Sequence, residues 1–412
     1  MSIVVQKYGG TSVADPDRIG AVADRVVRTR DEGHHVVVVV SAMGDTTDDL
    51  MAMAREITAV PHARELDLLL TAGERIAMSL LSIAINARGC PAASYTGSQA
   101  GIITDTRHGN AKIIDIKPGR IQEALTAGSV VIVAGFQGVS TAYDVTTLGR
   151  GGSDTTAVAL AAALGADRCE IYTDVAGVFT ADPRIVPNAR QLHAVSYEEM
   201  LEMTATGARV LQTRSVEYAR RSGILLHVRS SFSDDDGTWV TEEDERMEQA
   251  LISGVTHDLS EAKVTVYGVP DRPGVAATLF GAVADEGVNV DMIVQNVSRD
   301  ERTDVSFTAP KDDLARLSEI LERAGKEIDA EGFEVDDGVA KVSLVGAGMK
   351  SHPGVAAGMF AALAAEGINI EMISTSTIRI SCVVRAADAE RAVRAIHDRF
   401  DLGRATAVRD ER

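Results

Sequence analysis

The sequence contains few cysteines and no long apolar run, and each shortage excludes a class of protein. The three cysteines, Cys90, Cys169 and Cys382, are far apart and match no metal-binding or redox spacing. A reducing compartment suits them, so we expect a cytoplasmic location. The apolar runs are far shorter than the roughly 20 residues that span a bilayer, and we expect no membrane partner.

The chain also has fewer basic residues than acidic residues. The formal net charge is −19 at pH 7, which argues against nucleic acid and anionic membrane as partners. A locally positive site for an anionic substrate is still compatible with this charge. The first ten residues, MSIVVQKYGG, lack the basic stretch and following apolar stretch of a signal peptide, so we expect none there.

Apolar residues make up 45% of the 412 residues, and this length suits two or three domains. In the N-terminal part, strand-like and helix-like segments alternate. Strands are predicted near residues 3–6, 36–41, 130–134 and 170–173, and helices near residues 16–30, 66–84 and 155–164. This alternation predicts an α/β fold with a mostly parallel sheet that is covered on both faces.

The C-terminal part contains an internal repeat. A polar, acidic stretch at residues 230–248 marks a domain boundary, and beyond it Pro273-Gly274-Val275 recurs as Pro353-Gly354-Val355. The offset is 353 − 273 = 80 residues, and the match continues as far as Ile293 and Ile373. Each copy is predicted to fold as strand, Pro-Gly turn, helix, tight turn and strand.

Two glycine-rich loops connect a predicted strand to a predicted helix. In the first, Lys7-Tyr8-Gly9-Gly10, glycine amides and the helix end favour an anion, and a lysine can stabilise a transferring phosphoryl group. The second runs from Gly149 to Asp154, and its Arg150 suits bidentate carboxylate binding. An ordinary turn and a capped helix start are the alternatives. Because the GxxxxGK[ST] pattern and the protein-kinase motifs are absent, phosphoryl transfer would need another scaffold.

Two further segments carry polar groups beside glycine or at a strand end. Glu74, in Thr71-Ala72-Gly73-Glu74-Arg75, offers a carboxylate for an ammonium group, unless it only pairs with Arg75 on a helix surface. Thr173 and Asp174 end a predicted strand, the position at which open α/β sheets contact ligands. The turn at residues 180–184 follows.

Eight motifs follow one another along the chain: KYGGTS, SAMGDTTDD, LLTAGERI, TGSQAG, GFQG, TTLGRGGSDTTA, EIYTDV and TADPR. Taken together, and in this order, they resemble the aspartokinases of the amino-acid kinase superfamily over essentially the whole chain. The resemblance implies an amino-acid-kinase domain at residues 1–246 and two ferredoxin-like ACT regulatory domains at residues 247–332 and 333–412. It further implies transfer of the γ-phosphate of ATP, with Mg²⁺ on the phosphates, to the side chain of L-aspartate.

The resemblance also assigns roles by motif, with no metal-ligating residues. The implied catalytic residues are Lys7 and Asp154. The implied aspartate-binding residues are Ser41, Asp45, Thr46, Thr47, Glu74, Arg150, Gly151, Gly152 and Ser153. The implied nucleotide-binding residues are Tyr8, Gly9, Gly10, Thr173, Asp174, Phe179, Thr180, Asp182, Pro183, Arg184 and Arg209. The implied effector-binding residues are Asp271, Asn289, Val290, Asp291, Gln295, Val355, Asn369, Ile370, Ser376 and Thr377.

The chain departs from the family pattern at a few positions. Ala176 and Phe179 replace a carboxylate and a tyrosine, and Arg209 replaces a lysine, which bears on nucleotide affinity. Thr377 replaces a glutamate in the second repeat. A half-buried charge contact is worth about tenfold to a hundredfold in affinity, so we expect weaker feedback by lysine and threonine than is typical of the family.

The sequence also bears on assembly and leaves rival functions open. The resemblance implies a homodimer or an α₂β₂ assembly built through the ACT repeats, with a small subunit started internally at Met247. The rival interpretations are an amino-acid kinase for another substrate, a non-catalytic amino-acid-binding regulator, and a paralogue that serves a specialised pathway.

Overall fold

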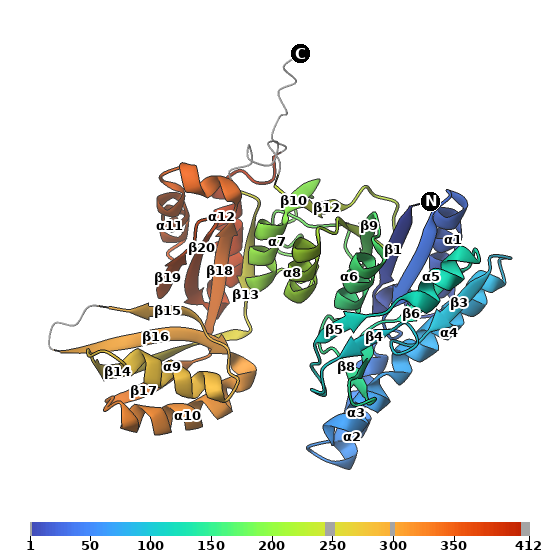
Figure 1. The fold of residues 1–412 in the computed structure, drawn as a ribbon. Helices are drawn as coiled ribbons and strands as arrows, with labels where there is room; N and C mark the ends of the chain where they lie inside the picture. Colours follow the sequence, from blue (N-terminus) through green and yellow to red (C-terminus); the bar gives the residue numbers. More distant parts are fainter. Residues whose placement is uncertain (1, 244–251, 297–300, 405–412) are drawn as a thin grey trace. The chain divides into compact units, whose positions relative to one another are not determined.

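The computed structural model describes residues 2–243, 252–296 and 301–404 (Figure 1). The described chain forms two compact units. The first contains residues 2–178, 191–204 and 209–243, and the second contains residues 179–190, 205–208, 252–296 and 301–404. The predicted boundary at residues 246/247, with Met247, lies outside the described residues.

An eight-stranded sheet forms the centre of the first unit. Its order is β10-β12-β11-β9-β1-β2-β6-β3, and only the pairing of β11 with β12 is antiparallel. The strands are β1 (Ile3–Tyr8), β2 (His35–Val40), β3 (Ala92–Tyr95), β6 (Val130–Ala134), β9 (Arg168–Thr173), β10 (Ala194–Ser196), β11 (Leu226–Ser230) and β12 (Thr238–Thr241). The prediction of a mostly parallel sheet is therefore confirmed.

Helices bury the faces of this sheet. The side chains of Val36 to Val40 are all at most 1% exposed, as expected for a β-branched strand covered on both sides. The helices α1 (Pro16–Asp31) and α4 (Ala72–Asn86) share one core with β2 and β6, and α6 (Gly152–Leu164) contacts β1, β2 and β9. The other helices of this unit are α2 (Thr46–Ile57), α3 (Ala63–Leu70), α5 (Gly119–Thr126), α7 (Tyr197–Ala205) and α8 (Thr213–Ser222).

A second, small sheet was not predicted from the sequence. Its order is β5-β4-β7-β8, with β4 (Ile102–Thr104), β5 (Ile113–Ile116), β7 (Gln137–Ser140) and β8 (Val145–Thr147). These strands have three or four residues each, too short to show a clear alternation in the sequence. The strand β8 leads directly into the glycine-rich loop at Gly149.

One helical stretch in the described part of the chain, Ala63–Asn86, is long and apolar enough to cross a membrane by length and composition. It comprises α3 and α4, which the sequence analysis predicted as a single helix over residues 66–84. Buried core helices of soluble proteins can have the same length and apolar composition. Ala77, Leu81 and Ile85 are fully buried in the core that α4 shares with the sheet.

The second unit contains the two repeats, each with a four-stranded antiparallel sheet. The first repeat has the order β15-β16-β14-β17, with β14 (Glu261–Pro270), α9 (Val275–Asp285), β15 (Asp291–Gln295), β16 (Arg302–Pro310), α10 (Leu314–Glu327) and β17 (Gly332–Asp336). Apolar side chains of α9 and α10 form its core with β14 and β16. The element order is that of a ferredoxin-like ACT domain, as predicted.

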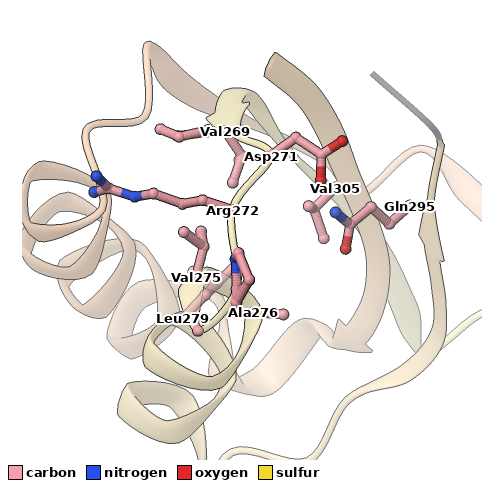
Figure 2. A pocket seen from close by; sticks show the side chains of 11 residues that line it. Val269, Asp271, Arg272, Val275, Ala276, Leu279, Gln295 and Val305 are labelled. Atoms are coloured by element: carbon pink, nitrogen blue, oxygen red, sulfur yellow. The ribbon is translucent and has the colours of Figure 1, made fainter. Parts of the chain in front are cut away.

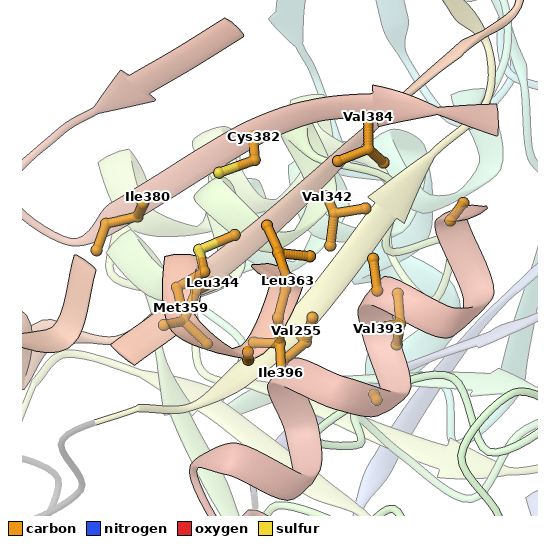
Figure 3. Close-up of a cluster of buried hydrophobic side chains, with 14 of the residues drawn as sticks. Val255, Val342, Leu344, Met359, Leu363, Ile380, Cys382, Val384, Val393 and Ile396 are labelled. Carbon is orange, nitrogen blue, oxygen red and sulfur yellow. The ribbon is translucent and has the colours of Figure 1, made fainter. Parts of the chain in front are cut away.

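The second repeat follows the same plan with a strand from elsewhere. Its sheet has the order β13-β18-β20-β19, with β13 (Gly254–Asp258), β18 (Val339–Val345), α11 (Val355–Ala365), β19 (Met372–Thr375), β20 (Arg379–Arg385) and α12 (Ala389–Arg399). Figure 3 shows its core, in which Val255 of β13 packs with Val342, Leu363 and Ile396. Because β13 precedes the first repeat in the chain, the two repeats interlock.

The structure corrects the predicted boundaries inside this unit. The boundary at residues 332/333 would cut β17, which pairs with β14 of the first repeat. The strand β13, assigned by sequence to the first ACT domain, pairs with β18 of the second. A boundary drawn in chain order cannot detect such an exchange. The 80-residue offset itself is confirmed, since α9 begins at Val275 and α11 at Val355.

Candidate active site

The centre of the candidate site is an ion pair between the two predicted catalytic residues. Lys7 lies near the end of β1, and Asp154 lies in the first turn of α6. Lys7 Nζ is 2.6 Å from Asp154 Oδ1, and the two side chains are only 12% and 9% exposed. Two residues that are 147 positions apart (154 − 7 = 147) are therefore brought together at the carboxyl end of the sheet, where α/β proteins bind ligands.

A cavity of about 600 Å³ opens beside this pair. Twelve of the predicted residues line it: Lys7, Gly10, Ser41, Thr47, Glu74, Arg150, Gly151, Gly152, Ser153, Asp154, Thr173 and Arg209. The structure thus gathers the predicted catalytic residues, most of the predicted substrate residues and part of the predicted nucleotide residues around one space. A volume of this size accommodates small-molecule ligands.

Close backbone contacts explain the glycines of the first loop. The amide of Gly9 donates to the carbonyl of Tyr172 (3.3 Å), and the amide of Ser41 donates to the carbonyl of Tyr8 (3.1 Å), so the ends of β9, β1 and β2 are tied together. A Cβ atom at Gly10 would lie 2.9 Å from the carbonyl oxygens of Ala42 and Gly44. Only glycine fits this position without a shift of the backbone.

The second loop also requires glycine. Gly149 and Gly151 have φ angles of 75° and 71°, in the left-handed region, and a Cβ at Gly151 would lie 2.0 Å from Cγ of Gln212. Between them, Arg150 is exposed and lines the cavity. Ser153 and Asp154 follow in the first turn of α6 and are largely buried. The loop therefore holds an exposed guanidinium beside a buried helix start.

Glu74 faces the cavity from α4 in an unusual electrostatic environment. Its side chain is 3% exposed, and Oε1 accepts a hydrogen bond from the amide of Ala42 (3.2 Å). Its other oxygen, Oε2, is buried and has no hydrogen-bond partner among the described residues. Burial raises the pKa of Glu74 to about 7, although the backbone hydrogen bonds act to lower it. Such a carboxyl group is suited to receive a cationic ligand.

Several predicted site residues do not line the cavity with their side chains. Tyr8 is fully buried and stacks on Tyr172 with ring centroids 4.7 Å apart, so only its backbone faces the loop region. Asp45 is exposed at the start of α2, and the hydroxyl of Thr46 donates to the carbonyl of Met43 (2.5 Å). Asp174 accepts from the hydroxyl of Thr173 (3.1 Å).

The remaining predicted nucleotide residues belong to the second unit: Phe179, Thr180, Asp182, Pro183 and Arg184. Asp182 forms an ion pair with Arg184 (2.6 Å), and this arginine holds the pKa of the carboxyl below its usual value. Thr180 is fully buried, accepts from the amide of Arg190 (2.9 Å) and lies 3.0 Å from Nε2 of His397.

A second cavity, of about 310 Å³, lies at the Pro-Gly turn of the first repeat (Figure 2). Two predicted effector residues line it: Asp271 at the start of the turn and Gln295 on β15. Val275 and Leu279 of α9 also line it. Gly274 precedes α9 with a φ of 98°. The turn therefore presents a helix start beside one carboxylate and one amide.

The other predicted effector residues lie elsewhere. Asp291 is committed to Lys341 of the second repeat, with a distance of 3.0 Å. Burial would raise the pKa of Asp291, but Lys341 outweighs it and holds the pKa below its usual value. The remaining members are partly or fully exposed except for Val355, which is buried: Asn289, Val290, Asn369, Ile370, Ser376 and Thr377.

The first cavity is also lined by residues that were assigned no role from the sequence. Among them are the polar or aromatic side chains of Asp67, Phe136, Thr147 and Gln212. Asp67 offered one signal, since it is an isolated carboxylate in the apolar stretch Leu66-Asp67-Leu68-Leu69. No cluster of three or more His, Cys, Asp or Glu side chains that could hold a metal ion occurs within the described residues.

Comparisons with known proteins agree with this architecture. The model of the amino acid kinase family matches residues 2–230, and ACT domain models match residues 263–328 and 342–400. Aspartokinases from Mycolicibacterium smegmatis and Mycobacterium tuberculosis (strain H37Rv) are 59% and 60% identical over 408 residues, covering 98% of this chain and 97% of theirs. The aspartokinase of Thermus thermophilus is 51% identical over 407 residues, covering 98% of this chain and 100% of its own.

Solved structures give the same result. A crystal structure of E. coli aspartokinase III in complex with aspartate and ADP matches with a TM-score of 0.83 at 28% identity, covering 96% of this chain and 99% of that one. Aspartate kinase from Synechocystis matches with a TM-score of 0.54 at 44% identity, covering 97% of this chain and 69% of that one. The chain therefore belongs to the aspartokinases, and it combines an amino acid kinase domain with two C-terminal ACT domains.

Proposed function

We propose that this kinase transfers the γ-phosphate of ATP to the side-chain carboxylate of L-aspartate, forming 4-phospho-L-aspartate. The observation that carries the proposal is the placement of Glu74 and Arg150 on the walls of one cavity with the Lys7–Asp154 pair. An amino acid presents an ammonium and a carboxylate, and these two side chains complement both groups. The relative from E. coli was crystallised with aspartate and ADP.

The proposed mechanism needs no covalent enzyme intermediate. The substrate carboxylate is itself the nucleophile, so the protein has to position it and neutralise charge. Lys7 would stabilise the charge that develops on the transferring phosphoryl group, and Asp154 would orient Lys7 through their 2.6 Å contact. Mg²⁺ would arrive with ATP as part of the substrate.

Residues of both cavity walls would then hold the two substrates. Glu74 Oε2, buried without a partner among the described residues, would accept the substrate ammonium, and Arg150 would grip a carboxylate. Gly10, Thr173 and Arg209 line the same space and would face the nucleotide. We also assign nucleotide contacts to the turn at residues 180–184, on the basis of the TADPR motif.

The direct test is a phosphotransfer assay with hydroxylamine trapping of the acyl phosphate. We expect hydroxamate with ATP and L-aspartate, and none with L-glutamate, N-acetylglutamate or carbamate. Product from one of the other carboxylates but not from aspartate would identify a different amino-acid kinase. Binding of an amino acid without ATP turnover would identify a non-catalytic regulator.

We further propose feedback control by lysine and threonine through the ACT repeats, which would suit the first step of the aspartate-family pathway of amino-acid biosynthesis. Asp271 and Gln295 at the 310 Å³ cavity would hold the effector's polar groups, and the start of α9 would attract its carboxylate. A crystal structure of E. coli aspartokinase III with lysine and aspartate matches this chain with a TM-score of 0.72 at 28% identity. Inhibition curves with lysine, threonine and both together test this proposal.

A homodimer or α₂β₂ assembly through the ACT repeats is also proposed. Ile293 on β15 and Ile373 on β19 occupy equivalent positions of the two repeats and are 52% and 43% exposed. Exposed apolar side chains on strands at the sheet edge favour association with another chain. A strictly monomeric species at micromolar concentration in light scattering would contradict this proposal.

A further inference from the structure

A buried carboxylate on α3, Asp67, has no role in the mechanism above. Its side chain is 1% exposed. Oδ1 accepts from the hydroxyl of Thr147 (2.5 Å) and the amide of Gly109 (3.0 Å), and Oδ2 lies 2.7 Å from Nδ1 of His108 and accepts from the same amide (3.1 Å). Burying a carboxylate is costly unless its oxygens are satisfied, and here both oxygens are.

The groups that bind Asp67 come from two segments that reach the cavity. His108 and Gly109 belong to the loop between β4 and β5, and Thr147 is the last residue of β8. These segments are also joined to each other, because the amide of Ala111 donates to the carbonyl of Thr147 (2.9 Å). Thr147 is followed by Leu148, Gly149 and Arg150. The hydrogen bond to Asp67 therefore fixes the chain three residues before the predicted aspartate-binding arginine.

Arg214 of α8 holds the same two segments from another side. Its guanidinium donates to the carbonyl of Leu148 (2.9 Å) and to the carbonyl of Ala111 (2.8 Å). The fit at the loop itself is tight, since a Cβ at Gly149 would lie 3.0 Å from the carbonyl oxygen of Gly109. The path of the Arg150 loop therefore depends on where Gly109 lies, and Asp67 binds the amide of Gly109.

Asp67 is also connected to the helix that carries Glu74. It lies seven residues before Glu74 (74 − 67 = 7), about two helical turns along the nearly continuous stretch Ala63–Asn86. Residues seven apart share one face of a helix. At the joint, the amide of Thr71 donates to the carbonyl of Asp67 (3.2 Å). One carboxylate thus connects the element that carries Glu74 with the loop that carries Arg150.

From these contacts we propose that Asp67 is a positioning residue for the acceptor amino acid. It keeps the Arg150 loop at a fixed distance from Glu74, so that the two groups grip the two ends of one substrate. Asp67 does not touch the substrate, since its oxygens are already occupied by protein donors. The inference rests on the proposed aspartate-binding roles of Glu74 and Arg150.

Two neighbouring threonines of β8 provide a matched test. Thr147 and Thr146 are both at most 1% exposed, and Thr147 bonds to Asp67 whereas Thr146 lies 2.6 Å from the hydroxyl of Thr104. Thr147→Val and Thr146→Val therefore remove one buried hydroxyl each from adjacent positions. We expect Thr147→Val to raise the KM for aspartate about tenfold with little change in the KM for ATP. Thr146→Val should lower Tm similarly and leave both KM values unchanged.

Variants of Asp67 itself separate positioning from direct substrate contact. Asp67→Ala should raise the aspartate KM at least as much as Thr147→Val, and adding Thr147→Val to it should raise the KM no further. Asp67→Asn keeps one acceptor oxygen for Thr147 and Gly109, so it should restore much of the affinity. A further rise in the double variant would show that Thr147 contacts the substrate itself and would overturn the proposal.

The remaining outcomes are equally informative. Equal changes in aspartate KM for Thr146→Val and Thr147→Val, or a lower Tm without any KM change in Thr147→Val, would show that Asp67 only stabilises the fold. Thr147→Val keeps the proposal testable if Asp67→Ala does not fold. Failure of the proposed function is distinguished by the wild-type enzyme, which would then form no hydroxamate from aspartate.

Discussion

The two units of the chain use buried charge in different ways. In the first, charged groups surround a cavity, and Glu74 Oε2 has no hydrogen-bond partner within the described residues. In the second, Lys341 is 1% exposed and lies 2.6 Å from Glu261 and 3.0 Å from Asp291, which are the first residues of β14 and β15 in the first repeat. Charge facing a cavity is available to a ligand, whereas charge paired across the repeats is part of the structure.

The pairing between the repeats follows their internal symmetry. Glu371 lies 80 residues after Asp291, and each pairs with a lysine of the other repeat: Asp291 with Lys341 (3.0 Å) and Glu371 with Lys263 (2.5 Å). These pairs flank a small apolar cluster that contains Met292 and Met372. The difference between the units predicts that substitutions of charge in the first unit change kinetics, and that those in the second change stability or regulation.

The largest effect is expected for Lys7→Ala. This substitution removes the charge that would stabilise the transferring phosphoryl group, so kcat should fall about a hundredfold to a thousandfold, with a much smaller change in the KM for aspartate. Steady-state kinetics with both substrates varied provide the measurement. A near wild-type kcat would remove Lys7 from the catalytic role.

The next effect concerns Arg150→Lys. An ammonium cannot reproduce the bidentate fork of a guanidinium, and the KM for aspartate should rise about tenfold to a hundredfold. Arg150 is exposed at the cavity, so Tm should not change. An unchanged aspartate KM would refute the assignment of Arg150 as the carboxylate clamp.

A third test uses the titration of Glu74. Its pKa is raised to about 7 by burial, so the carboxyl takes up a proton as the pH falls through 7 and then cannot bind an ammonium group. The kcat/KM for aspartate should therefore fall about tenfold per pH unit below pH 7. In Glu74→Gln the value should be low and lose this dependence. A wild-type profile that stays flat between pH 6 and 8 would contradict the role of Glu74.

In the second unit, removing the buried charge of Lys341 is expected to reduce stability. Lys341→Met leaves Glu261 and Asp291 without their buried partner and should lower the free energy of unfolding by about 2 kcal/mol. This loss is smaller than that for a fully buried pair because the side chain of Asp291 is 39% exposed. The exposed Arg391 pairs with Asp388 (3.1 Å), and Arg391→Met should cost less than about 0.5 kcal/mol. Denaturant unfolding measures both. A lower kcat without effector in Lys341→Met would break the division between the units.

The comparison also shows what sequence patterns can predict. The glycine loops and the strand ends singled out Lys7, Arg150 and Asp154, and these residues line one cavity because parallel strands bring their carboxyl ends to one edge. The repeat predicted the paired sheets and both Pro-Gly helix starts. These features depend on local chemistry that the sequence displays directly.

The features that were missed depend on contacts between distant segments. Asp67 and Arg214 occupy no glycine loop or strand end, and their function arises only when α3, α8 and the loop after β4 converge. The exchange of β13 into the sheet of the second repeat pairs residues about 90 positions apart, such as Gly254 with Val345. No local pattern specifies a partner at that separation.

The smallest effect is expected for Thr377→Glu, the substitution that restores the glutamate of the family pattern. Thr377 is exposed in the turn between β19 and β20. A carboxylate there would be solvated, and an exposed ion pair contributes at most about 1 kcal/mol. The expected gain in lysine and threonine inhibition is therefore about twofold to fivefold, smaller than the tenfold to hundredfold effect of a half-buried contact.

Inhibition curves for the wild type, Thr377→Glu and the uncharged control Thr377→Gln test this expectation. A shift in Thr377→Glu but not in Thr377→Gln would show that the charge itself strengthens inhibition. A shift much larger than fivefold would indicate that position 377 is covered in the assembled enzyme, because burial by a partner chain would raise the worth of the added carboxylate. Identical curves for all three proteins, or complete inhibition of the wild type at micromolar lysine and threonine, would refute the idea that Thr377 weakens feedback.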